Sequence, residues 1–179
     1  FLTLRLGVGD LPLDADIRYP EKKFTMDDDS LQDAMLSLGA EPKQLIDVPI
    51  SVSLVDNITV GIFGDLSNTA NTLKSLILQM VALHSYDELK IMLITDEAEK
   101  NEWNFIRPIP HFWNDEKTVR FFATNADEVK ELSVYMEKNI LSRKDASNQE
   151  YSDFPPYYVI VSTSKKLAEN CEAIQQMLR

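Results

Sequence analysis

Residues 58–83 have the sequence ITVGIFGDLSNTANTLKSLILQMVAL. An apolar run over Ile58–Phe63 is followed by the polar residues 64–72, and then by apolar side chains at helical spacing. The run predicts a buried strand, and the spacing after it predicts an amphipathic helix that packs against the core. We therefore expect a strand, a loop and a helix here. The predicted inner face of the helix carries Leu73, Leu76, Ile77, Met80 and Val81.

Short apolar strands continue to alternate with amphipathic helices toward the C-terminus. The predicted strands are Leu89–Ile94, Val119–Ala123 and Tyr157–Val161, and the predicted helices cover residues 125–141 and 167–178. Between them, Ser142–Asp153 is polar and has no periodicity, so we expect a mobile loop. Strands that alternate with helices favour right-handed crossovers and a mainly parallel sheet.

The N-terminal residues 1–56 predict a smaller part that contains strands and one helix. Asp27-Asp28-Asp29 comes just before the helical pattern, where we expect it to cap free N–H groups in preference to binding a divalent ion. The predicted elements are a strand over Phe1–Leu6, a turn at Gly7–Asp10, a short strand at Ile17–Tyr19, a helix from Leu31 that closes at Gly39, and a strand over Val48–Val55 that pairs with Ile58–Phe63.

Together these elements predict an α/β fold with a mainly parallel sheet flanked by helices. The layout is P-loop NTPase-like (Rossmann-like), with an N-terminal β-hairpin extension. We expect a single degenerate ATPase-like domain over residues 1–179, with a hairpin and helix part at 1–56 and an α/β core at 57–179. Because the chain stops inside a predicted helix, we expect the core to be truncated at its C-terminus.

The charge of the chain argues against nucleic acid as a direct partner. Acidic residues outnumber basic ones 29 to 18, the formal net charge is −11, and no basic block compensates. No apolar run reaches the roughly 18 residues that a membrane-spanning helix needs, so we expect no membrane insertion by this segment. The single cysteine, Cys171, falls on the apolar face of a predicted helix and is expected to be a buried core thiol.

The loop after Ile58–Phe63 lies where α/β folds bind ligands. A working P-loop needs two glycines, a lysine for the outer phosphates and a hydroxyl for Mg²⁺. Gly64 supplies the first glycine, but Thr69, Ala70 and Asn71 stand at the positions of the second glycine, the lysine and the hydroxyl. Asp65 adds a negative charge beside the position that a phosphate would occupy. At a separation of about 4 Å and an effective dielectric constant of about 20, the repulsion between the two charges costs a few kcal/mol. The loop is therefore predicted to be vestigial.

The second half of an NTPase site is also incomplete. A Walker B strand ends in an acid that helps to hold Mg²⁺. The apolar strand Tyr157–Val161 ends instead in Ser162-Thr163-Ser164. We therefore expect no catalytic residue, no nucleotide-binding residue and no metal ligand in this domain.

The histidines and two arginines are weaker candidates. No Cys/His spacing matches a zinc site, and His84 is expected to have a structural role at a helix end. His111 belongs to an aromatic cluster that is either a satellite core or an exposed contact patch. Arg107 and Arg120 could reach a neighbouring subunit's nucleotide, although surface or structural roles are commoner for arginine.

With these residues in view, the chain resembles the EssC/EccC proteins, the membrane-anchored FtsK/SpoIIIE-type motor ATPases of type VII (Esx) secretion systems, and the EssC branch most closely. No single motif is decisive, but the order and spacing of the matching segments are specific. These segments are FLTLRLGVGDLPL at 1–13, Val60–Asp65, Leu73–Met80, His84–Leu89, and Trp103 followed by Ile109–His111.

The resemblance implies a cytoplasmic domain between the membrane stalk and the first of three ATPase modules, in a motor that exports WXG-type proteins. It implies ATP and Mg²⁺ as cofactors of the other modules, with none for this domain. Its implied partners are other domains and subunits of the secretion complex, WXG-type substrates, and further copies in a ring. The departures at Thr69, Ala70, Asn71 and Ser162 put nucleotide binding in doubt.

Three hypotheses remain for the function of the domain. The first is a non-catalytic domain that couples or joins parts of the secretion motor. The second is a divergent domain that binds or slowly hydrolyses ATP through backbone N–H groups of the Gly64 loop and the following helix N-terminus. The third is a domain that recognises WXG-type cargo.

Overall fold

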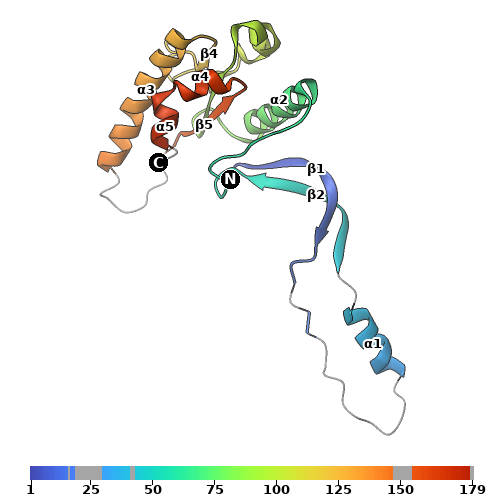
Figure 1. Ribbon diagram of the computed structural model, residues 1–179. Coiled ribbons are helices and arrows are strands. Elements are labelled where there is room, and N and C mark those ends of the chain that lie inside the picture. Colours follow the sequence, from blue (N-terminus) through green and yellow to red (C-terminus); the bar gives the residue numbers. More distant parts are fainter. Residues whose placement is uncertain (16, 19–29, 41–42, 147–154, 178–179) are drawn as a thin grey trace. The chain divides into compact units, whose positions relative to one another are not determined.

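The computed structural model describes residues 1–15, 17–18, 30–40, 43–146 and 155–177 (Figure 1). The chain divides into two compact units, Phe1–Ile77 and Leu78–Arg179. Helix α2 (Leu66–Leu83) begins in the first unit and ends in the second. Among the described residues, no helix is long and apolar enough to cross a membrane.

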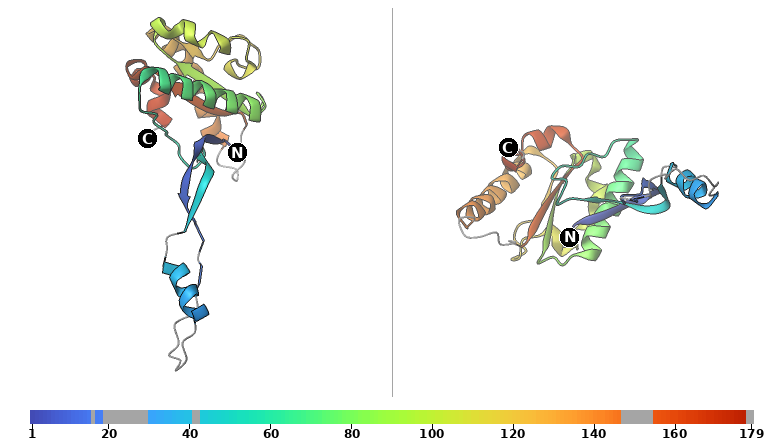
Figure 2. Two further views of the ribbon diagram at one scale, coloured as in Figure 1. Left: turned by 90° about the vertical axis from the view of Figure 1, so that its right-hand side faces the viewer. Right: turned by 90° about the horizontal axis from the view of Figure 1, so that it is seen from below.

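The first unit contains a long antiparallel ribbon of two strands, β1 (Thr3–Pro12) and β2 (Gln44–Ser53) (Figure 2). The turn predicted at Gly7–Asp10 is wrong, because β2 pairs with β1 along this stretch. The pairing register is irregular between Arg5 and Gly7 and again between Gly9 and Leu11. Gly9 allows a close approach between the strands. A Cβ atom at that position would lie 2.6 Å from Cδ1 of Ile50.

The other predictions for the N-terminal part have mixed outcomes. The helix is confirmed as α1 (Ser30–Ala40), but it continues through Gly39 instead of closing there. Ile17 and Arg18 are not in a strand, and Tyr19 lies outside the described residues. The acidic residues 27–29 also lie outside the described part, so their predicted capping role stays a prediction.

The strand predicted at Ile58–Phe63 is wrong. No residue of this segment belongs to a strand, and the side chains of Ile58 and Phe63 are 85% and 94% exposed. β2 pairs with β1 instead, and at its end both the backbone and the side-chain amide of Asn57 donate to the carbonyl of Ser53. This five-residue turn does not form the tight connection of a two-residue hairpin, so the chain leaves the ladder.

Helix α2 confirms the predicted amphipathic helix. Leu76, Ile77 and Met80 are buried, and Leu73 and Val81 are half-buried on the same stripe. The spacing of these apolar residues therefore located both the helix and its inner face.

The second unit is built on a three-stranded parallel sheet with the strand order β4-β3-β5. Strand β3 (Leu89–Ile94) is central and buried along its whole length, as expected for a parallel strand that is covered on both faces. It pairs with β4 (Phe122–Ala123) on one side and with β5 (Tyr157–Ser162) on the other. The predicted α/β fold, with a parallel sheet flanked by helices and an N-terminal β-hairpin, is confirmed.

Three helices cover one face of this sheet: α3 (Ala126–Ala146), α4 (Lys165–Glu169) and α5 (Glu172–Met177) (Figure 1). They form one hydrophobic cluster with alternate residues of β3, namely Met92 and Ile94. The cluster also contains Phe121, Ala123, Val129, Leu132, Met136, Leu167, Cys171 and Ala173.

Two predictions about these helices need correction. α3 continues through Ser142 to Ala146, so the first part of the predicted loop is helical, while residues 147–153 lie outside the described part. The last predicted helix is two short helices, because the N–H groups of Asn170 and Cys171 bond to carbonyls only three residues back. Leu178 lies outside the described residues.

Between β3 and β4 the chain forms two 3₁₀ helices, η1 (Glu97–Ile106) and η2 (Pro110–Phe112). Their apolar side chains Trp103, Ile106 and Phe112 are buried. No residue from Glu97 to Phe112 is in an α-helix, which agrees with the prolines at positions 108 and 110.

Candidate functional site

The residues that correspond to a P-loop are mostly helical. α2 begins at Leu66, so the loop predicted over residues 64–72 is wrong beyond Asp65. The backbone N–H of Thr69 donates to the carbonyl of Asp65 at 2.9 Å, and its hydroxyl lies 3.0 Å from the same oxygen and 2.9 Å from the carbonyl of Leu66. Ala70 and Asn71 follow within the same helix. Without a second glycine, this stretch continues the helix instead of opening a cradle for phosphate.

The second unit offers a different candidate, the edge at which its parallel strands end. Ligands of open α/β sheets bind outside the carboxyl ends of the strands. Each strand here is followed directly by a threonine or a serine and then by polar residues. Thr95 follows β3, Thr124 follows β4, and Ser162 ends β5 before Thr163.

One half of this edge joins β3 to β5 through side chains. The hydroxyls of Thr95 and Thr163 lie 2.8 Å apart, and each lies 2.9 Å from Oε2 of Glu99. Beside them, the hydroxyl of Ser164 donates to Asp96 at 2.9 Å. Ser162, which stands where a Walker B acid would be, donates its hydroxyl to the carbonyl of Ser164 at 3.0 Å. Each hydroxyl therefore has a partner within the edge.

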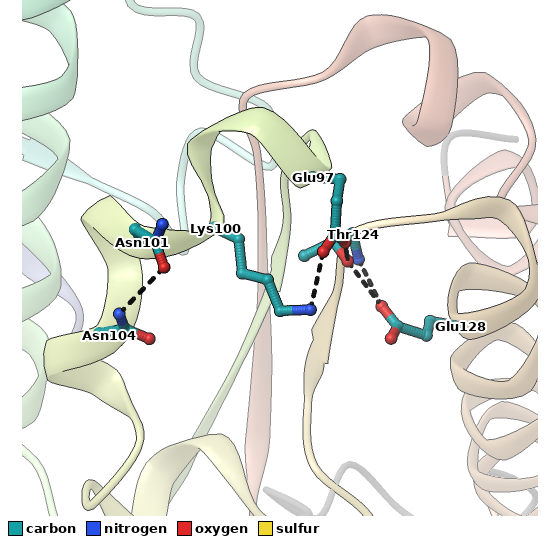
Figure 3. A network of polar contacts seen from close by, with 6 residues as sticks. All are labelled: Glu97, Lys100, Asn101, Asn104, Thr124 and Glu128. Carbon is teal, nitrogen blue, oxygen red and sulfur yellow. Dashed lines mark hydrogen bonds and ion pairs between the residues drawn. The ribbon is translucent and has the colours of Figure 1, made fainter.

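The other half joins β4 to η1 and α3 (Figure 3). The hydroxyl of Thr124 bonds to carboxylates from both sides, Glu97 of η1 and Glu128 of α3. Glu128 also accepts the backbone N–H of Thr124 at 2.7 Å, and Lys100 pairs with Glu97 at 2.9 Å. The hydrogen bond from Thr124, followed by that from Lys100, lowers the pKa of Glu97.

The electrostatics of this edge oppose an anionic ligand. Four carboxylates, those of Asp96, Glu97, Glu99 and Glu128, accept hydrogen bonds there, with Lys100 paired to one of them. No group of three or more metal-ligating side chains is arranged to hold a metal ion within the described residues. The edge therefore acts as a closed network that ties the loops to the sheet, and it repels phosphate.

Sequence reasoning identified Ser162 at this edge but missed the four carboxylates. A local signal existed, because a hydroxyl residue ends or follows each strand at equivalent places. The carboxylate partners of these hydroxyls had no such signal. The Gly64 loop and Ser162 belong to different units, the loop to Phe1–Ile77 and Ser162 to Leu78–Arg179.

Comparison with known proteins points to one group of secretion proteins. No family model matches the chain. It is 25% identical over 168 residues to the ESX secretion system protein YukB of Bacillus subtilis (strain 168), with 93% of the chain covered. It is 22% identical over 172 residues to the type VII secretion system protein EssC of Staphylococcus aureus (strain NCTC 8325 / PS 47), again with 93% covered. The chain is a relative of the EssC/EccC proteins.

The similarity extends to the ESX-3 secretion system protein EccC3 of Mycobacterium tuberculosis (strain ATCC 25618 / H37Rv), at 26% identity over 112 residues and 62% of this chain. The resemblance to EssC/EccC that the sequence motifs indicated is thereby confirmed. The chain spans 11% of the length of YukB and 12% of that of EssC.

The remaining candidate residues of this EssC/EccC relative have structural positions. Cys171 is buried, as predicted. His84 lies just after the end of α2, and its carbonyl oxygen is 2.9 Å from Nε2 of His111. His111 and Phe112 are buried and belong to the core, whereas Trp113 of the same aromatic cluster is half-buried.

The buried side chain of His111 is expected to make the stability of this EssC/EccC relative sensitive to acid. Burial lowers the pKa of His111. The hydrogen bond to the His84 carbonyl opposes this shift, and the charge of Lys90 adds to it. The Nδ1 atom of His111 is buried without a hydrogen-bond partner. The pKa of His111 is lower in the folded state than in the unfolded state, where it is about 6.5. The contribution of neutral His111 to stability is therefore fully present above that pH and decreases as the pH falls below it.

Urea unfolding between pH 7 and pH 5 measures this effect. We expect the urea concentration at the unfolding midpoint to fall as the pH is lowered. This dependence of the midpoint on pH should be weaker in His111→Gln, because the glutamine side chain stays neutral and keeps a hydrogen-bond donor. An equal slope in both proteins would show that His111 does not cause the acid dependence.

Proposed function

We propose that this chain is a coupling and interaction domain of a type VII secretion protein and does not hydrolyse nucleotide itself. The observation that carries the proposal is the start of α2 at Leu66. The N–H and hydroxyl of Thr69, at the position of the second P-loop glycine, are both used inside the helix. No lysine occupies the next position, which is Ala70.

The carboxyl edge of the parallel sheet supports the same proposal. Magnesium nucleotides need a cationic or N–H-rich surface for phosphate and an acid for the metal. Here the hydroxyls and carboxylates bond to one another, and Ser162 replaces the Walker B acid. An NTPase-like outline without phosphate chemistry suits a part that transmits or receives movement.

At the level of the whole protein, we propose a membrane-anchored FtsK/SpoIIIE-type motor. In this proposal ATP and Mg²⁺ act in other modules, and WXG-type proteins are the exported substrates. The domain would lie on the cytoplasmic side and contact other domains and subunits of the secretion complex, including further copies in a ring. The names of YukB, EssC and EccC3 as secretion system proteins support this assignment.

A thermal scan separates this proposal from a divergent nucleotide-binding domain. We expect millimolar ATP with Mg²⁺ to leave the melting temperature unchanged, because a ligand raises it only by binding the native state. Asp65→Asn is the matched variant. It removes the charge beside the vestigial loop, and we still expect no shift because Thr69 remains helical. A rise in melting temperature in either protein would favour the divergent nucleotide-binding domain.

A further inference from the structure

Two arginines of the second unit are held at one tryptophan by backbone geometry. Arg107 directly follows η1, and its carbonyl accepts a hydrogen bond from the indole Nε1 of Trp113 at 3.1 Å. Trp113 forms an antiparallel backbone bridge with Arg120. Beside this bridge, the backbone N–H of Phe121 donates a hydrogen bond to the carbonyl of Phe112 at 2.7 Å. The backbone positions of both arginines are therefore set by short-range structure.

Among the described residues, neither guanidinium group forms an ion pair with a carboxylate. Arg120 is half-buried, its Nε is buried without a hydrogen-bond partner, and its guanidinium carbon lies 4.6 Å from the centre of the Phe122 ring. Burial and then the charge of Arg107 lower the pKa of Arg120, and Glu128 opposes this effect. Glu128 uses Oε2 to accept hydrogen bonds from Thr124. No ion pair among the described residues includes either arginine.

Both arginines are linked to Trp113, and within the described part of the chain neither forms an ion pair, although the net charge of the chain is −11 and the charge of Glu128 acts on Arg120. Guanidinium groups bind carboxylates and phosphates through paired, charge-assisted hydrogen bonds. The net charge of the chain and the carboxylate of Glu128, whose charge acts on Arg120, disfavour an anion that carries several charges, such as a triphosphate. The half-exposed indole of Trp113 adds an apolar surface for the methylene groups of an acidic side chain.

We propose that Arg107, Trp113 and Arg120 form a binding site for a carboxylate side chain on an acidic segment of a protein partner. This site gives a chemical identity to one contact of the coupling domain. Its geometry does not involve the Gly64 loop, so the proposed site can fail while the absence of nucleotide binding holds, and the reverse.

Nuclear magnetic resonance of the full chain tests the site through the indole N–H signal of Trp113. The probe is the peptide acetyl-Ala-Glu-Glu-Ala-amide at low ionic strength, with acetyl-Ala-Gln-Gln-Ala-amide as the neutral control. We expect a saturable shift of this signal with the acidic peptide only. Inorganic phosphate is titrated separately, and it should need a higher concentration than the peptide for the same shift.

Charge-matched variants locate the binding. Arg107→Glu changes an exposed side chain and should weaken peptide binding at least about tenfold, as expected for the loss of a charge-assisted hydrogen-bond pair. Lys130→Glu makes the same charge change on the exposed face of α3 and should leave the affinity within about twofold. Because both sites are exposed, the fold is expected to persist, which circular dichroism checks.

Several results would overturn the proposal. They are an absent or unsaturable shift, an equal response to the glutamine peptide, or an equal loss in Lys130→Glu and Arg107→Glu. Tighter binding of inorganic phosphate than of the peptide would replace the carboxylate with a phosphate ligand and would also overturn it.

Discussion

Phe121→Ala is expected to lower the free energy of unfolding of the second unit by about 3–5 kcal/mol, the range for a fully buried phenylalanine. Phe121 is 0% exposed and belongs to the cluster that joins β3 to the helices on one face of the sheet. Its ring centre lies 5.4 Å from that of Tyr135 on α3 and 6.0 Å from that of Tyr158 on β5. Truncation therefore removes packing between a helix and a strand and leaves a cavity.

Urea unfolding measures this loss when it is followed both by tryptophan fluorescence, since Trp103 and Trp113 lie in the second unit, and by far-ultraviolet circular dichroism, which also reports on the first unit that holds Phe63. Phe63→Ala is the matched control. Phe63 is 94% exposed, so we expect a change within about 0.5 kcal/mol. A loss in Phe63→Ala as large as that in Phe121→Ala would mean that Ile58–Phe63 is a buried strand, contrary to the fold described above.

Asp115→Ala is expected to lower the free energy of unfolding by about 1–3 kcal/mol. Asp115 pairs with Nζ of Lys90 at 2.8 Å, and the Lys90 side chain is only 3% exposed on the central strand β3. Loss of one partner of a fully buried pair costs about 3–5 kcal/mol. We reduce this figure because the Asp115 side chain is 75% exposed and water screens it. Lys90 would then keep the contact between its Nζ and the ring of Tyr86, whose centre is 5.3 Å away.

A second substitution tests the cause of this loss. In the Asp115→Ala background, Lys90→Met removes the unpaired buried charge and should restore most of the stability, since apolar replacements of buried ion pairs are often neutral or stabilising. Glu169→Ala is the exposed control. It breaks the ion pair between Lys165 and Glu169, whose charged atoms are 3.7 Å apart; the Lys165 side chain is 89% exposed and the Glu169 side chain 62%. The change in stability should therefore be less than about 0.5 kcal/mol. Equal effects of Asp115→Ala and Glu169→Ala would contradict the buried-charge explanation.

The parts of the fold that were predictable from sequence carry a local pattern. β3 and β5 are short apolar runs next to helical patterns, and their positions followed from that alone. α2 followed from its apolar stripe, and the burial of Cys171 followed from its place on such a stripe. In these elements the residues that form the structure are neighbours in sequence, so periodicity describes them.

The errors have a common physical origin in non-local partners. The run Ile58–Phe63 has the composition of a strand, but composition does not say whether a neighbouring strand is available, and β2 pairs with β1. The polar edge was missed for the same reason. The hydroxyls of Thr95 and Thr163 are 68 residues apart in sequence, yet both contact Glu99. Local patterns cannot specify such pairs.

The missing P-loop residues were visible in sequence, and the structure adds what replaces them. Sequence comparison with a working P-loop identified Thr69, Ala70 and Asn71 as departures. It did not predict that α2 would start at Leu66 and use the Thr69 N–H internally. At residues 64–71 the second glycine, the lysine and the hydroxyl residue of a P-loop are replaced by Thr69, Ala70 and Asn71, and these three residues are helical, which supports the proposed coupling role.

Isothermal titration calorimetry of the chain with ATP and Mg²⁺ is the most direct test of that role, with a phosphate-release assay on the same sample. We expect no binding heat at micromolar protein with up to millimolar ATP, and no magnesium-dependent phosphate release. Micromolar binding accompanied by magnesium-dependent turnover of the isolated chain would contradict it.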